Sequence, residues 1–316
     1  MRRLALLLML VVVPASHGSR AGGHPVALVT AETQDQLLVV ALSSGRVEQR
    51  LHMPADPQNV EANDRNAVVV STRAGAVTLL DARRLSVTRV FRGLARPHIA
   101  SLSPNGRYAY VTDDARGQLV VIGLAHKRIL ARLFVGFGAH HMSFRPHHHE
   151  VWIALGERAR SIAIVDTTHA AHPRRRGWFQ AQLGGLVHDL AFAPGGRRLW
   201  VTFADRPTVE VFDVRTRRRV ASLAAGSPPQ HVAFRRYAYV TSGNDGRLRI
   251  FSVAGRLLGT AAVPQGSFNV APSPAGGVVT SSLTNGRFTV LGISGRELMS
   301  RRVAPAARDS APLILP

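Results

Sequence analysis

The sequence predicts an all-β fold, a seven-bladed β-propeller of four-stranded antiparallel blades. Three observations predict it: a hydrophobic segment recurs seven times, each copy has several strand-like segments, and the two chain ends complete one copy between them. The segment ends, at intervals of 39 to 48 residues, at Thr30, Ser71, Thr112, Ala154, Thr202, Thr241 and Thr280. A repeat of about this length is typical of one propeller blade.

The third copy shows most clearly why each blade should hold four strands. Its β-branched and aromatic segments cover residues 98–103, 108–113, 118–124 and 129–135. Pro104-Asn105-Gly106 and Arg116-Gly117 separate the first three, and these residue types favour the backbone angles of tight hairpin turns. No segment of ten or more residues has helical periodicity, so we expect antiparallel strands throughout.

The two ends of the chain should close the ring. The first copy starts at its second-strand segment, residues 26–30, and has no first strand of its own. Residues 309–313 align with the start of the first strand in other copies, so the C-terminus should supply the innermost strand of the first blade. Residues 19–316 would then form one propeller domain. An insertion at residues 167–177 accounts for the 48-residue interval, and we expect it to be an extended loop.

The N-terminus has the pattern of a secretory signal peptide over residues 1–18. A basic start, an apolar run at residues 4–13 and small residues at 14–18 follow in order. The ten apolar residues fall short of the ~20 that a membrane-spanning helix needs. We expect a cleaved signal and a secreted or extracytoplasmic protein that does not span the membrane; an uncleaved anchor is the alternative.

One motif resembles a known group of propellers. The segment at residues 102–112, LSPNGRYAYVT, is similar to the SPDGxxxYVTN signature of YVTN-type seven-bladed propellers. The segments ending in Asp166 and Asp213 match the VID that follows that signature. The resemblance covers nearly the whole chain after residue 18 and implies the fold. Its members include surface-layer-like proteins, exported binding proteins, lactonases and the propeller parts of haem d1 and copper enzymes.

The composition excludes several classes of protein. The chain has no cysteine, which excludes disulfide scaffolds, thiolate metal sites, cysteine nucleophiles and covalently attached c-type haem. The formal net charge of +21 favours anionic partners such as phosphate, acidic polymers or anionic lipid. Lys127 is the only lysine, so arginine carries the charge. Such arginine usage is typical of GC-rich coding and weakens the argument for nucleic acid.

A basic cluster at Arg174, Arg175 and Arg176 is a candidate anion-binding site. It lies beside Trp178 and Phe179, which we expect to be exposed with it. Aromatic residues make up only 6% of the chain, whereas single-strand binders stack bases on aromatic platforms. A protein, an anionic cell-envelope polymer or a small ligand is therefore favoured over nucleic acid, and a merely solvated basic face is the alternative.

Seven polar residues recur at the start of the innermost strands and should form a ring at one mouth of the channel. They are Asn59, His98, His141, His188, His231, Asn269 and Asp309. Imidazole binds Zn, Cu, Ni and Fe, so the four histidines are candidate ligands of a divalent metal ion or of a small anion. A metal would engage two or three adjacent positions, with help from His140 or Asp189. The alternative is structural: the imidazoles bond loop carbonyls between neighbouring blades.

The remaining motifs carry little chemistry. His147-His148-His149 replace the Asn-Gly of a turn and would bind metal only adventitiously, because adjacent turn side chains diverge. No Gly-x-Ser-x-Gly, Walker or dinucleotide motif is present. We expect a monomeric, exported binding or interaction protein that uses the channel mouth and arginine-rich loops. The alternative is an enzyme with the histidines at its site, a lactonase-like hydrolase or a metal- or quinone-linked oxidoreductase component.

Overall fold

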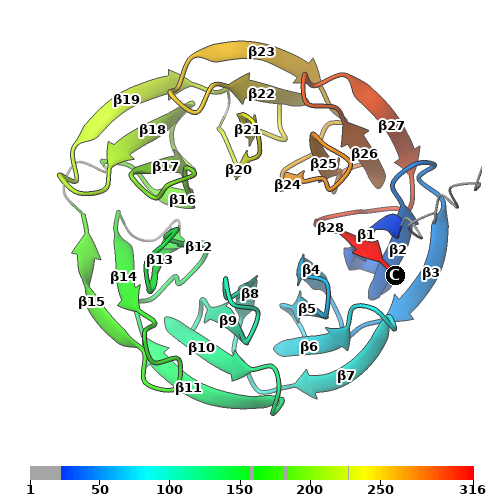
Figure 1. Cartoon of the computed structure of the whole chain (residues 1–316), viewed down its shortest axis with the longest axis horizontal. Helices are drawn as coiled ribbons and strands as arrows, with labels where there is room; N and C mark the ends of the chain where they lie inside the picture. The colour runs from blue at the N-terminus through cyan, green and yellow to red at the C-terminus, as the bar shows by residue number, and fades with distance from the viewer. Residues whose placement is uncertain (1–22, 157–159, 181–183, 227) are drawn as a thin grey trace, which may run out of the picture.

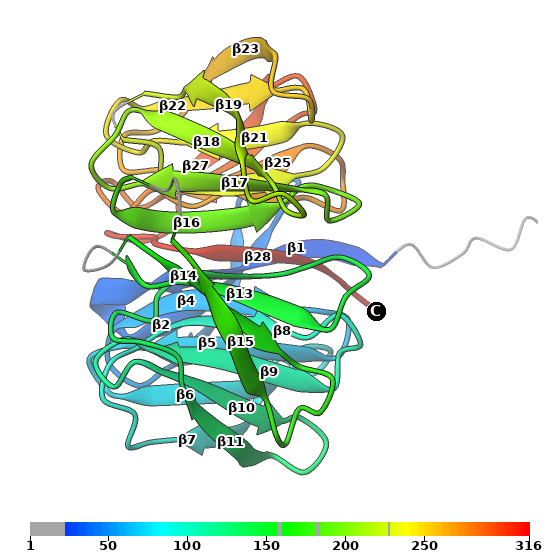
Figure 2. The same cartoon turned by 90° about the vertical axis from the view of Figure 1, so that its left-hand side faces the viewer.

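The computed structural model describes residues 23–156, 160–180, 184–226 and 228–316. The expected signal peptide lies outside these residues. Within the described part, seven four-stranded antiparallel sheets stand around a central channel, which confirms the predicted fold (Figure 1). Figure 2 shows the ring from the side, with the strands of its blades running across its thickness. η1 (Glu32–Gln34) is a 3-10 turn, and no described helix is long and apolar enough to cross a membrane.

The strands of each blade run from the channel outward, with one strand per blade in each layer. The innermost strands are β28 (Ser310–Leu315), β4 (Pro57–Ala62), β8 (Pro97–Leu102), β12 (Met142–Phe144), β16 (Val187–Phe192), β20 (Val232–Phe234) and β24 (Ala271–Pro272). The second strands are β1 (His24–Ala31), β5 (Asn66–Ser71), β9 (Tyr108–Asp113), β13 (Glu150–Ala154), β17 (Arg198–Phe203), β21 (Ala238–Thr241) and β25 (Val278–Ser281).

The two outer layers complete the blades. The third strands are β2 (Gln36–Ala41), β6 (Ala76–Asp81), β10 (Gln118–Gly123), β14 (Ile162–Asp166), β18 (Thr208–Asp213), β22 (Arg247–Phe251) and β26 (Arg287–Leu291). The outermost strands are β3 (Val47–His52), β7 (Ser86–Phe91), β11 (Arg128–Phe134), β15 (Arg174–Phe179), β19 (Arg219–Ala224), β23 (Leu257–Ala262) and β27 (Glu297–Arg302). We number the blades from the one that contains β1.

The C-terminal strand closes the ring, as the sequence predicted. β28 pairs antiparallel with β1 from His24↔Leu315 to Val29↔Ser310. Figure 1 shows the C-terminal strand lying beside the N-terminal strand at the channel. This pairing gives blade one the innermost strand that its own repeat lacks.

The core consists of hydrophobic layers between neighbouring blades. Alternate residues of β1 face opposite sides: Val26 and Leu28 pack against blade two, whereas Ala27 and Val29 pack against blade seven. Because both faces of a second strand are covered, its residues are apolar without alternation, and that is why the repeat was visible in the sequence. The packing makes the inner ends of the strands firm supports for side chains at the channel.

The predicted loop at residues 167–177 is wrong in its second half. Arg174, Arg175 and Arg176 belong to β15, the outermost strand of blade four. Arg174 and Arg175 pair with β14, Arg176 lies at a register shift, and residues 177–179 continue the ladder. The three arginines are exposed, so they lie on the outer wall of the ring in a strand and not in an extended loop.

Candidate functional site

All seven residues of the predicted ring line one cavity at the channel mouth. The cavity has a volume of about 300 Å³ and contains Asn59, His98, His141, His188, His231, Asn269 and Asp309 among its lining residues. It lies where the chain enters the innermost strands, so each blade contributes to it. The structure thus brings the candidate residues together at one mouth.

The prediction that the seven share one column is wrong at His98 and His188. The backbone N–H groups of Ile99, Asp189 and Asp309 each donate to the threonine hydroxyl at the end of their own second strand, at 3.0–3.1 Å. Ile99 and Asp189 are therefore the structural equivalents of Asp309, and His98 and His188 lie one residue earlier. Counting residues between repeats missed this shift because the turns differ in length.

The mouth is lined by two adjacent rings of side chains. The upstream ring is Gln58, His98, His140, His188, Gln230, Phe268 and Arg308. The downstream ring is Asn59, Ile99, His141, Asp189, His231, Asn269 and Asp309. Five histidines therefore converge on one side of the mouth, three from the upstream ring and two from the downstream ring.

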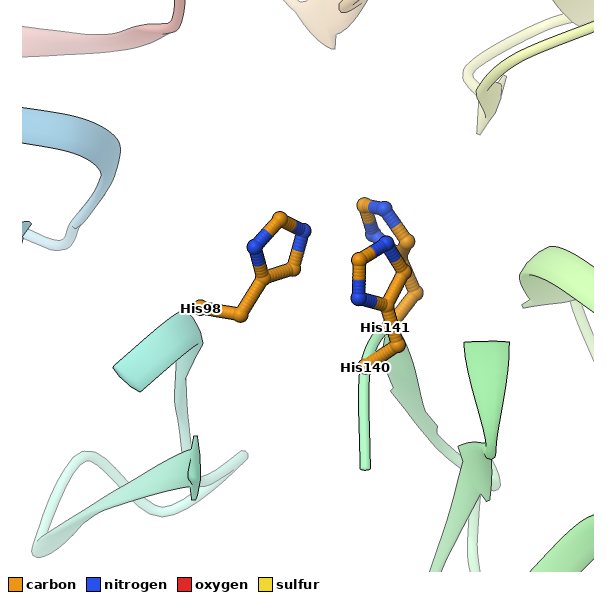
Figure 3. Close-up of side chains that lie close together, drawn as sticks. All are labelled: His98, His140 and His141. Carbon is orange, nitrogen blue, oxygen red and sulfur yellow. The ribbon is translucent and has the colours of Figure 1, made fainter. Parts of the chain in front are cut away.

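His98, His140 and His141 form one group, which we call the stacked triad. One nitrogen from each lies within 4.8 Å of the others. The rings of His98 and His140 lie parallel, with centroids 3.7 Å apart and an interplanar angle of 11°. Figure 3 shows His98 reaching from blade three toward the two consecutive histidines of blade four. The geometry is that of two imidazoles in face-to-face contact with a third at their edge.

His141, His188 and His231 form a second group, the convergent triad, from three consecutive blades. Their nitrogens also lie within 4.8 Å of one another. The three rings are inclined to each other by 52°, 78° and 77°, so they approach a common point from different directions. Both ring nitrogens of His188 are buried and have no hydrogen-bond partner. His141, which is only 5% exposed, belongs to both triads.

Two carboxylates lie behind the imidazoles. Asp189 places its oxygens 3.7 Å from Nδ1 of His141 and 3.5 Å from Nδ1 of His231. Asp114 lies 3.9 Å from Nδ1 of His140 on the far side of the stacked triad. In metal sites, a ligating histidine commonly directs its second nitrogen toward such a carboxylate, which fixes the ring and raises its basicity.

Burial keeps four of the imidazoles neutral. It lowers the pKa of His140 and His188 to about 3, with the other cationic groups around the cavity adding to the effect. The pKa values of His98 and His141 are also well below the usual histidine range, for the same reason. At neutral pH each of these four rings therefore has one nitrogen with a free lone pair, which is the form that coordinates metal.

The remaining predicted ring residues form a polar clasp that we define as Asn59, Asn269 and Asp309. Both asparagine amides donate to the Asp309 carboxylate, that of Asn59 at 2.7 Å. The backbone N–H of Val60 donates to the same carboxylate at 3.0 Å, and Asn59 Oδ1 accepts the N–H of Ala100 at 2.8 Å. The clasp therefore links blades seven, one, two and three, because its side chains bond one another and the backbone of the neighbouring blades.

The sequence indicated only supporting roles for His140 and Asp189 and carried no signal for Asp114. His140 occupies the same upstream position as His98 and His188. The residue that marks this position is the threonine near the end of a second strand. Thr112 Oγ1 donates to the carbonyl of His140 in the next blade, as Thr202 Oγ1 donates to that of Gln230. Asp114 lies in a turn, and nothing local marks it as a neighbour of His140.

The predicted anion-binding arginines are largely engaged elsewhere. Arg176 forms an ion pair with Asp166, and the Arg175 guanidinium lies 4.4 Å from the Trp178 ring centroid. The expectation that Phe179 is exposed is wrong, because it is buried in the core between blades four and five. Trp178 is partly buried.

The three consecutive histidines lie on the surface, as expected of a turn. His147, His148 and His149 are exposed and line a separate cavity of about 780 Å³ with Tyr108 and Phe144. His147 has a φ of 62°, a left-handed backbone that histidine adopts with some strain. None of the three belongs to either triad.

No protein-family model matches the chain, and no curated protein matches it. Its fold is similar to that of a functionally unknown protein from Desulfotomaculum acetoxidans DSM 771, with 12% identity and a TM-score of 0.80 over 92% of this chain and 99% of that one. It is also similar to apo AztD from Citrobacter koseri, with 10% identity and a TM-score of 0.72 over 92% of this chain and 98% of that one. Dihydro-heme d1 dehydrogenase NirN in complex with DHE matches at 15% identity and a TM-score of 0.64, over 89% and 64% of the two chains. At these identities the similarity shows a shared propeller fold.

Proposed function

We propose that this protein binds a divalent transition-metal ion in the convergent triad. The observation that carries the proposal is the meeting of three imidazoles from three blades around His188, whose two nitrogens are buried without a hydrogen-bond partner. Leaving a buried polar atom unpaired costs about 1–3 kcal/mol, so such atoms in a folded protein indicate a missing partner. A metal ion is the partner that three convergent imidazoles suit best.

The arrangement fits three-histidine coordination. Zinc sites of this kind have three nitrogen ligands at about 2.0–2.1 Å and an open fourth position for water or another ligand. Two nitrogens in a tetrahedral site lie roughly 3.3 Å apart by that geometry. The triad nitrogens lie within 4.8 Å of one another, so modest side-chain rotations complete the site. Asp189 supplies the negative charge and orients two of the three rings.

The proposal includes the cellular setting that the sequence favours. We propose that the protein is exported by the signal peptide at residues 1–18 and that it belongs to the YVTN-type propellers. The basic and apolar N-terminal pattern supports export, and the motif at residues 102–112 together with the seven-bladed fold supports the family. The metal ion is then bound outside the cytoplasm, by a binding protein.

The test is metal binding by untagged mature protein stripped with a chelator. We expect one Zn²⁺ per chain by competition with a chromophoric chelator, and a tetrahedral ligand-field spectrum with Co²⁺. His188→Gln and His231→Asn should each weaken binding by at least ~100-fold, since loss of a second-layer partner alone costs ~10–100-fold. These substitutions copy Gln58 and Asn59, which occupy the equivalent ring positions of blade two.

A matched control removes the surface histidines. The triple variant His147→Asn, His148→Gly and His149→Arg reproduces the Asn105-Gly106-Arg107 turn of blade three. It should bind zinc as the unchanged protein does. Loss of the ion in this control, or absence of stoichiometric metal from the unchanged protein, would overturn the proposal.

A further inference from the structure

A second cavity of about 380 Å³ adjoins the channel mouth. It is lined by Arg96, Asp114 and Gly138 and shares Gln58, His98 and His140 with the first cavity. The stacked pair therefore forms part of the wall between the two cavities. The convergent triad lines the first cavity and not the second, so the second cavity, which we call the vestibule, lies across the stacked pair from the proposed metal site.

Asp114 gives this vestibule the chemistry of a cation site. It is 8% exposed, and its Oδ1 is buried without a hydrogen-bond partner. Its Oδ2 accepts from Arg96 at 2.5 Å and lies 3.9 Å from Nδ1 of His140. Arg96 is 44% exposed, so it can move into solvent when a cation takes its place. A buried carboxylate oxygen without a donor is unfavourable until a cation or a donor reaches it.

The stacked pair cannot hold an ion in its present arrangement. In-plane lone pairs of two parallel rings point in parallel directions, and the rings of His98 and His140 are 3.7 Å apart. An ion at about 2 Å from one nitrogen lies out of the plane of the other ring. One ring must turn before both can bind the ion, and that same turn opens the wall between the cavities.

We propose, as an extension of the metal-binding function above, that Asp114, His98 and His140 form an uptake site together with His141, and that the ion passes from it to the convergent triad. His141 is the shared ligand. Its Nδ1 faces Asp189, so Nε2 serves one ion at a time, and the chain holds one ion in one of two overlapping positions. The ion passes from His140, which lines the vestibule, to the next residue, His141, which lines the channel cavity.

The test measures the rate of uptake and release with Co²⁺ as the probe. Stopped-flow absorption should show Asp114→Asn taking up Co²⁺ about tenfold more slowly, the lower end of what local charge does to association rates. His98→Gln should slow uptake by a similar factor, because it removes a nitrogen ligand of the uptake site. Release into excess chelator should slow by a similar factor, so that the equilibrium affinity moves by less than threefold. His188→Gln should behave differently, with a faster release and a weaker affinity, because it removes a ligand of the final site.

Asp64→Asn is the matched control for charge. Asp64 is exposed and lies in the turn after β4, outside the residues that line either cavity at this mouth. It changes the net charge as Asp114→Asn does and should leave both rates as they are. Uptake at the unchanged rate in both Asp114→Asn and His98→Gln overturns the uptake site, as does simultaneous binding of two Co²⁺ ions per chain. If the unchanged protein binds no Co²⁺, the metal-binding function itself fails.

Discussion

The two halves of the channel mouth use equivalent backbone positions in opposite ways. At the junction of blades seven, one and two, the polar clasp of Asn59, Asn269 and Asp309 completes its hydrogen bonds internally. At blades four to six, the equivalent downstream positions hold His141, Asp189 and His231, beside an upstream His188 whose nitrogens have no partner. The fold is the same on both sides, so the side chains alone decide the difference. One half holds the ring closed, and the other leaves both nitrogens of His188 without a partner.

Breaking the clasp should have the largest effect on stability. Asp309→Ala leaves two asparagine amides and the backbone N–H groups of Val60 and Ser310 without their acceptor. We expect the free energy of unfolding of the metal-free protein to fall by about 3–5 kcal/mol, the usual cost of removing one member of a buried polar network. Urea denaturation followed by tryptophan fluorescence measures it.

The histidine half provides the comparison for that experiment. His231→Asn places at blade six the residue that blades two and seven already carry as Asn59 and Asn269. Its cost should stay below about 1 kcal/mol, because His231 is only partly buried and takes no part in the clasp. Equal losses in Asp309→Ala and His231→Asn would mean that the two halves do not differ in structural role.

The two halves of the mouth should give the protein pH dependences of opposite sign. The buried histidines, whose pKa values are lowered, cost stability as the pH falls below 6.5, whereas Glu61 in the clasp half costs stability as the pH rises. Burial raises the pKa of Glu61 to about 7, and the nearby Asp309 carboxylate adds to the shift. The folded protein therefore binds this proton more tightly than the unfolded chain, in which Glu61 titrates near 4.5. Stability from the protonated form is present below about pH 4.5 and is lost as the pH rises toward 7, by on the order of 2 kcal/mol.

Glu61→Gln isolates that effect. Relative to the unchanged protein, the variant should gain on the order of 2 kcal/mol of unfolding free energy as the pH rises from 4.5 to 7, and it should be the more stable of the two at pH 8. Urea midpoints of both proteins across this range give that difference, from which the contribution of the histidines cancels. A difference that stays constant from pH 4.5 to 7 would assign the titration to other groups.

The repeat pattern predicted the fold because both faces of each second strand are buried, so Val26 to Val29 read as an unbroken apolar segment. It also located the mouth, since the residue at the start of each innermost strand recurs with the repeat. It could not set the register there. His98 and His188 fall one residue before the equivalents of His141, and only the bonds to Thr112 and Thr202 reveal it. Asp114 becomes part of the site through a contact between blades, which no local pattern encodes.

The smallest expected effect tests whether His188, whose ring nitrogens have no partner, lowers the stability of the metal-free protein. His188→Leu removes two buried nitrogens that have no hydrogen-bond partner, and Phe268 shows that an apolar side chain fits the equivalent upstream position. In metal-free protein the variant should be more stable by about 1 kcal/mol. Zinc at a hundred times its dissociation constant should stabilise only the unchanged protein, by about 2.7 kcal/mol, and so reverse the order. If metal-free His188→Leu is instead the less stable protein, the imidazole supports the fold, and the contrast between the two halves of the mouth disappears.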